Sequence, residues 1–220
     1  SSCSSLESLN LNNIETSSAT LNLNSNKTGI EILEGGRIDI SKASIAGGTV
    51  GVSLTGSGSI TGGTIQLNNN ETPILATGGS NFKISNNIDN LSLAGNTVGL
   101  LAKGAGSKIS IESIGKLKTE DNDTLIKAED GGKITIADEM EVTGNKKAIS
   151  AISGGSITGK NITITNNEVA IEAGEGGKIN FEGTIDIKDN NKGEGVGIKM
   201  LGGAVTAGNI KLTKNVTCIE

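Results

Sequence analysis

The sequence contains almost no aromatic residues. Trp and Tyr are absent, and Phe82 and Phe181 are the only aromatic side chains among 220 residues. Each aromatic side chain buries a large apolar area, so a globular domain of this length normally builds its core around several of them. The apolar residues present are instead Ile, Leu, Val and Ala. This composition favours a narrow core made of repeated thin layers over one thick central core.

Histidine is also absent, which excludes the Ser-His-Asp and Cys-His arrangements of nucleophilic catalysis. The two cysteines, Cys3 and Cys218, have no plausible base partner in the sequence, and zinc lacks its usual ligands. The glycine-rich nonapeptide repeat that binds calcium is not found either. We therefore predict no catalytic residue, no metal site and no cofactor.

Positive charge is scarce and dispersed. The net charge is -5, Lys and Glu are interspersed, and Arg37 is the single arginine. Because nucleic-acid binding needs clustered Lys or Arg, often with stacking aromatics, we exclude nucleic acid as a partner. No apolar run is long enough to span a membrane and no signal peptide is recognisable, so we expect no membrane insertion by this chain. Both ends look cut, and we expect a fragment of a longer protein.

Glycine, by contrast, is abundant, and its 33 residues mark an internal repeat. The stretch GIEILEGGRIDI at 29–40 has counterparts such as GVSLTGSGSITG, AISAISGGSITG and AIEAGEGGKINF. The first apolar residues of the copies are 21 to 27 residues apart and form the column Ile30, Val52, Ile74, Leu100, Ile126, Ile149, Ile171, Ile198 and Ile219. A second apolar column lies two residues further on, and a glycine column follows it. Such a period is the mark of a repeat architecture.

Each repeat contains three short stretches in which apolar and polar residues alternate. The second stretch follows the glycines and carries Ile38, Ile60, Phe82, Ile109, Ile134, Ile157, Ile179 and Val205. The third carries pairs such as Ile65 with Leu67, and an Asn-rich turn closes it. Alternation of β-branched residues predicts strands with one buried face. Glycine suits corners with positive φ, and asparagine tolerates the left-handed conformation.

Three such strands in one repeat are too short for useful hairpins, but they can form one triangular coil. Stacked coils place each strand parallel to its counterpart, about 4.8 Å away, so that backbone groups pair between turns. We predict an all-β fold, a right-handed single-stranded parallel β-helix with three short strands per turn and roughly nine to ten turns. It would form one domain over 1–220, with a less regular N-terminal turn at 1–28 and regular turns at 29–220. An antiparallel sandwich would make these columns accidental.

The repeat also predicts where the two cysteines lie. Cys3 precedes the first complete turn, and Cys218 lies directly before the last first-strand position. Nine turns would separate their Cα atoms by about 40 Å, whereas a disulfide needs them within about 7 Å. We therefore predict no disulfide within one chain. The thiols would be free, paired outside this fragment, or joined between molecules stacked end to end.

A polysaccharide-acting β-helix enzyme is an alternative that the sequence can test. Such a site needs outward carboxylates stacked on adjacent turns. The outward positions of the third strand are Gln66, Ser92, Lys118, Glu141, Thr163, Asp186 and Lys211. Because no carboxylates stack in this column, we predict that the chain is not an enzyme.

The turns after the third strand are the best candidates for a binding surface, because loops carry binding more often than strands. They supply a predicted charged ridge, which consists of Asp121, Asp123, Lys146, Lys147, Glu168, Lys192 and Glu194. The stretch NNKGEGVG at 190–197 belongs to the longest repeat. It is either a recognition loop or a tolerated insertion.

A second candidate surface is a pair of leucines. Leu75 and Leu101 occupy the outward position of the first strand on successive turns, where the other repeats carry polar residues. They would either contact a partner or be covered by the longer loops of their own repeats. We favour the second possibility.

The repeat resembles the passenger region of bacterial autotransporters, the type V secreted proteins. The resemblance rests on GGRIDI, GGKITI, GGSITG and GGKINF with Asn-terminated third strands, and it covers nearly the whole chain. In that family the β-helix is exported across the outer membrane through a C-terminal β-barrel, which we do not expect within these 220 residues. The resemblance implies a chain that is secreted or displayed on the bacterial cell surface.

The same resemblance implies two functions of different class. The first is an adhesin-like, virulence-associated rod that binds host cells through a surface protein or glycan. The second is a released soluble ligand that binds and activates a specific host cell-surface receptor. End-to-end or lateral self-association of the rod is a further expectation.

Overall fold

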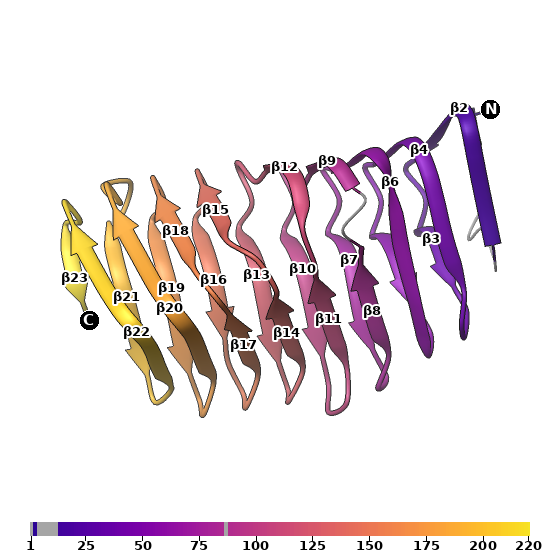
Figure 1. Cartoon of the computed structure of the whole chain (residues 1–220). Helices are drawn as coiled ribbons and strands as arrows, with labels where there is room; N and C mark the ends of the chain where they lie inside the picture. The colour runs from indigo at the N-terminus through magenta and orange to yellow at the C-terminus, as the bar shows by residue number, and fades with distance from the viewer. Residues whose placement is uncertain (1, 4–12, 86–87) are drawn as a thin grey trace.

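The computed structural model describes residues 2–3, 13–85 and 88–220 and folds as a right-handed parallel β-helix of about nine turns (Figure 1). All pairings between its named strands are parallel, and the two ends of the chain lie at opposite ends of the stack. The described residues form no helix, and so none that could cross a membrane. The predicted fold class is confirmed.

The first strands of successive turns form a nine-stranded sheet. Its members are β3 (Thr28–Ile32), β5 (Val50–Leu54), β7 (Thr72–Thr77), β10 (Val98–Lys103), β13 (Thr124–Glu129), β16 (Lys147–Ala151), β19 (Val169–Gly174), β21 (Val196–Leu201) and β23 (Thr217–Ile219). Each residue of the predicted column from Ile30 to Ile219 pairs with the next, so the alignment of the first strands is confirmed.

The second and third strands together form a fourteen-stranded sheet. Its members are β1 (Ser2–Cys3), β2 (Asn13–Asn24), β4 (Arg37–Ala46), β6 (Ser57–Asn68), β8 (Asn81–Ile84), β9 (Ile88–Ser92), β11 (Lys108–Ile111), β12 (Ile114–Lys118), β14 (Lys133–Ile136), β15 (Met140–Thr143), β17 (Ser156–Gly159), β18 (Ile162–Thr165), β20 (Lys178–Lys188) and β22 (Ala204–Thr213). The middle turns have three separate strands. In β2, β4, β6, β20 and β22 the second and third strands run on as one. Because β2 pairs with β4 on both sides of a register shift between Thr16 and Thr20, the stack already includes part of the segment 1–28.

One part of the predicted second-strand column is wrong. Ile60 pairs with Ile84 rather than with Phe82, which lies opposite Gly58 instead. The connection from the first strand to the second is two residues longer in the turn of Ile74 than in the two turns before it, and it stays one to three residues longer in the later turns. Because side chains alternate with a period of two, this offset still points every apolar residue of the column inward.

The core is a stack of thin apolar layers, as the lack of aromatics predicted. Its inward positions are Ile, Leu, Val and Ala, most of them at most 2% exposed. Phe82 and Phe181 are both fully buried. Opposite Phe181 stands Gly159, where a Cβ would lie 2.5 Å from the Phe181 ring. The Phe181 ring therefore fits into the core because the neighbouring turn has a glycine, which carries no side chain, at the paired position.

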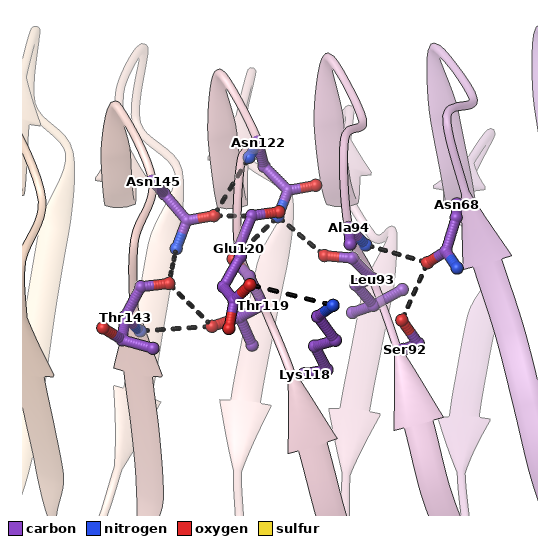
Figure 2. A network of polar contacts seen from close by, with 10 residues as sticks. All are labelled: Asn68, Ser92, Leu93, Ala94, Lys118, Thr119, Glu120, Asn122, Thr143 and Asn145. Atoms are coloured by element: carbon purple, nitrogen blue, oxygen red, sulfur yellow. Dashed lines mark hydrogen bonds and ion pairs between the residues drawn. The ribbon is translucent and has the colours of Figure 1, made fainter.

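A column of asparagines lines the corner between each third strand and the next first strand, and Figure 2 shows two of them, Asn122 and Asn145. All are buried except Asn215 in the last turn, which is half-buried. The backbone N–H of each except the last donates to the side-chain Oδ1 of the asparagine one turn further on, at 2.8–3.2 Å. These ladder asparagines are Asn70, Asn96, Asn122, Asn145, Asn167, Asn190 and Asn215. The residue before each has positive φ. The left-handed conformation at the corner is therefore adopted by the residue before each ladder asparagine. The asparagine itself, which the sequence predicted as a turn residue, makes the hydrogen bonds that link the turns.

The ladder is interrupted at residue 48, where glycine stands in place of asparagine. Gly48 still donates its N–H to Oδ1 of Asn70, at 3.0 Å. It offers no side chain to Asn26, the corresponding residue one turn earlier. Both polar atoms of the Asn26 side chain are buried without a hydrogen-bond partner in the described part of the chain. The asparagine ladder is therefore continuous only from Asn70 to Asn215.

The two cysteines belong to strands at opposite ends of the stack (Figure 1). Cys3 is in β1, which pairs with the first long strand, and Cys218 is in β23, the last first-strand segment. Cys218 is exposed and free. An intramolecular disulfide between them is therefore excluded by the stack of turns.

Candidate functional site

The charged ridge follows directly from the asparagine ladder. Asp123, Lys146 and Glu168 each come immediately after a ladder asparagine. Their backbone N–H groups donate to the carbonyl oxygens of the ladder asparagines one turn earlier, at 3.0–3.1 Å. Because this bond repeats in every one of these turns, the three charged side chains emerge in one row along an edge of the β-helix.

Two adjoining grooves run along this row. One, of about 320 Å³, is lined by the charged residues Asp121, Asp123, Lys146, Glu168 and Lys192. The other, of about 430 Å³, is lined by Asp123, Lys146, Lys147, Glu168, Glu172, Glu194 and Lys199. The structure thus brings together all seven residues of the predicted charged ridge.

Ion pairs link adjacent turns across the charged ridge. Lys146 pairs with Asp123 one turn earlier, and Lys147 pairs with Glu172 one turn later. Glu194 pairs with Lys199, at 3.3 Å. The Lys146–Asp123 pair is exposed on both sides, so it contributes little to stability. In the other two pairs one partner is largely shielded from solvent, Glu172 in one and Lys199 in the other. The three pairs hold the long side chains in a defined pattern of charge.

Three members of the charged ridge have no ion pair within the described residues. These are Asp121, Glu168 and Lys192. Glu168 lies against the loop of the longest repeat, since a Cβ at Gly193 would come within 3.0 Å of its side chain. That loop is a tight turn in which Gly195 donates its N–H to the Lys192 carbonyl, at 2.9 Å. The inserted residues 191–195 therefore belong to the surface of the charged ridge.

The hydrogen bond to Asp123, and then its negative charge, raise the pKa of Lys146 above its ordinary value of 10.5. A raised pKa means that the pair stabilises the fold below that ordinary value and that this contribution is lost as the pH rises through the raised pKa. Lys146 is therefore protonated at neutral pH.

The leucine pair lies away from the charged ridge, on the outer face of the nine-stranded sheet. Leu75 and Leu101 are paired neighbours in β7 and β10, and both are half-buried. The extra length of the Ile74 repeat, relative to the turn before it, is divided between the connection from the first to the second strand and the segment from the second strand to the ladder asparagine. The pair thus presents a small, partly exposed apolar spot.

The sequence analysis missed a groove of about 490 Å³ between β12 and β15. The chain advances eleven positions from Ile111 to Asn122 but only nine from Ile136 to Asn145, counted from the last inward residue of the second strand to the ladder asparagine. A two-residue difference also separates the segment Ile60–Asn70 from the segment Ile84–Asn96, whose third strands β6 and β9 stay paired. Segment length therefore does not by itself mark the groove in the sequence.

Within the described part of the chain, no group of three or more His, Cys, Asp or Glu residues could hold a metal ion. Comparison with protein-family models, with curated proteins and with solved structures finds no match to this chain.

Proposed function

We propose that this β-helix is a binding module of the autotransporter-passenger type, secreted or displayed on the bacterial surface, that attaches to host cells. The observation that carries the proposal is the charged ridge, in which seven charged side chains from successive turns line two adjoining grooves. Its unpaired members, Asp121, Glu168 and Lys192, offer charges of both signs to a partner. Such a pattern suits recognition of a host surface protein or glycan through complementary charge.

A binding role suits the outward strand positions better than catalysis. The third-strand neighbours Glu141, Thr163, Asp186 and Lys211 alternate in chemistry rather than stacking carboxylates.

Reversing two charges of the ridge tests the binding role. The double variant Lys146→Glu with Lys147→Glu should attach to cultured host cells at least about tenfold more weakly and with a weaker dependence on salt. Attachment of labelled protein would be measured at two ionic strengths. The matched control is Lys133→Glu with Lys178→Glu, which changes the net charge equally at exposed positions on the other sheet. Equal attachment by the two double variants would remove the charged ridge from the proposal.

A second candidate function is that of a released ligand that activates a host receptor. It is favoured by the inserted loop 191–195, because a receptor ligand is expected to carry one irregular patch on an otherwise regular rod. Purified protein added to the same cells separates the two functions. An adhesin should bind without a cellular response, whereas a receptor ligand should elicit one at concentrations near its binding constant. A response that survives reversal of Lys146 and Lys147 would argue against the ridge as the receptor contact.

A further inference from the structure

The fourteen-stranded sheet is split between β12 and β15, although these are the third strands of consecutive turns. Among the described strands, β12 pairs only with β9, and β15 pairs only with β18. Each strand therefore presents an unpaired backbone edge to the other, in the middle of an otherwise continuous stack. We call the opening between them the gap.

Direct contacts close the gap at both ends. At the start, Ala137 donates its N–H to the carbonyl of Ile111, at 2.8 Å. At the far end, the hydroxyl of Thr119 stands between the two turns (Figure 2). It accepts the N–H of Thr143 at 3.1 Å and donates to the Thr143 carbonyl at 3.2 Å. A side chain thus replaces the missing backbone pair, and residues 138–142 are left without a neighbour on this side.

The backbone of β15 aims a donor and an acceptor into the gap. Met140 directs its N–H away from the gap, to the Asn161 carbonyl on the β18 side, whereas Thr143 directs its N–H toward β12. Because successive residues of a strand point their backbone groups to opposite sides, the N–H and C=O of Glu141 face the gap. An unpaired strand edge is a template for another extended chain.

The floor of the gap is apolar. Ile111 and Ile136 are core residues at most 2% exposed, and Met140 is 6% exposed. Ile114 and Leu117 pack against the same core but stay half-buried. Apolar side chains from an added strand would complete this layer, as they do in every other turn.

The rim of the gap carries more negative than positive charge. Glu139 and Glu141 on the β15 side are exposed and form no ion pair within the described residues. Lys116 faces them from β12, and Glu112 is paired with Lys83. Two unpaired carboxylates against one ammonium favour a basic occupant.

We propose that the gap binds an extended peptide segment of about five residues in which apolar and basic side chains alternate. Its backbone would pair with the edge of β15, its apolar side chains would fill the floor, and its basic side chains would meet Glu139 and Glu141. This site is separate from the charged ridge and does not depend on the proposed attachment to host cells.

A blocked pentapeptide of alternating lysine and valine is the probe, and its counterpart of alternating glutamate and valine is the control. Titration followed by amide NMR should show the basic peptide shifting residues 112–118 and 138–142. The Glu141 amide should exchange rapidly with solvent in the free protein and at least about tenfold more slowly with peptide bound. Val142, whose backbone faces β18, should be protected throughout.

A second experiment reverses the charges at the rim of the gap. The double variant Glu139→Lys with Glu141→Lys should bind the basic peptide about tenfold more weakly, whereas Glu182→Lys with Asp186→Lys on β20 should bind it as the unmodified protein does. Equal binding by the two double variants, or equal binding of the two peptides, would overturn the proposal. So would a Glu141 amide already protected without peptide, because β12 and β15 would then be paired in solution. These outcomes concern purified protein and peptide, so they leave the test of the charged ridge unaffected.

Discussion

Replacing Ile126 by Asp is expected to lower the free energy of unfolding by several kcal/mol. Ile126 lies in β13, is fully buried, and stacks between Leu100 and Ile149 on the neighbouring turns. The substitution places a carboxylate in a dry apolar layer that contains no partner for it. Thermal or denaturant unfolding followed by circular dichroism measures the loss.

A substitution three residues away is the control for this variant. Asp123→Ala removes only the exposed ion pair with Lys146 and should cost at most about 1 kcal/mol. Ile126→Val keeps the layer apolar and should cost about 1 kcal/mol. If Ile126→Asp and Asp123→Ala were equally stable, the assignment of inward and outward positions would be wrong.

Replacing Asn122 by Leu should destabilise the protein about as much as Ile126→Asp does, although the leucine side chain is apolar and similar in size to asparagine. The Asn122 side chain donates to the Leu93 and Thr119 carbonyls, at 2.7 and 2.9 Å, and accepts the backbone N–H of Asn96 at 3.0 Å. Leucine leaves these buried groups unpaired, and each unpaired group costs about 1–3 kcal/mol. We expect a loss of about 3–5 kcal/mol in the same unfolding measurement.

The matched control is an asparagine outside the ladder. Asn191 directly follows the ladder residue Asn190 but is exposed. Asn191→Leu should change stability by less than about 0.5 kcal/mol. A small loss for Asn122→Leu would mean that backbone pairing and apolar layers alone hold the corner together.

The repeat could be predicted from the sequence because two periods coincide in it. Alternation fixes which face of each strand is buried, and the spacing of about one turn fixes which strands are neighbours. The first-strand column was therefore correct throughout. The second-strand column failed where Ile60 was aligned with Phe82, because an offset of two residues preserves the alternation and leaves no mark in the pattern.

The charged ridge could be located from the sequence because its residues occupy the same place in successive repeats. The ladder that positions them was not foreseen, since an asparagine in a turn and a buried asparagine look alike in a sequence. The gap was also missed. It depends on whether β12 and β15 are paired, and neither residue type nor segment length reveals this in the sequence.

The interruption at Gly48 divides the β-helix into parts that should open separately. Hydrogen bonds of the ladder asparagines link each turn from Asn70 to Asn215 to the next, so we expect these turns to unfold as one cooperative block. Upstream of Gly48 the side-chain link is missing, and Asn26 is left with unsatisfied buried groups. The N-terminal turns should therefore fray first, and native-state hydrogen exchange should find lower protection in β3 than in β13. One missing side chain thus sets the direction from which the rod comes apart.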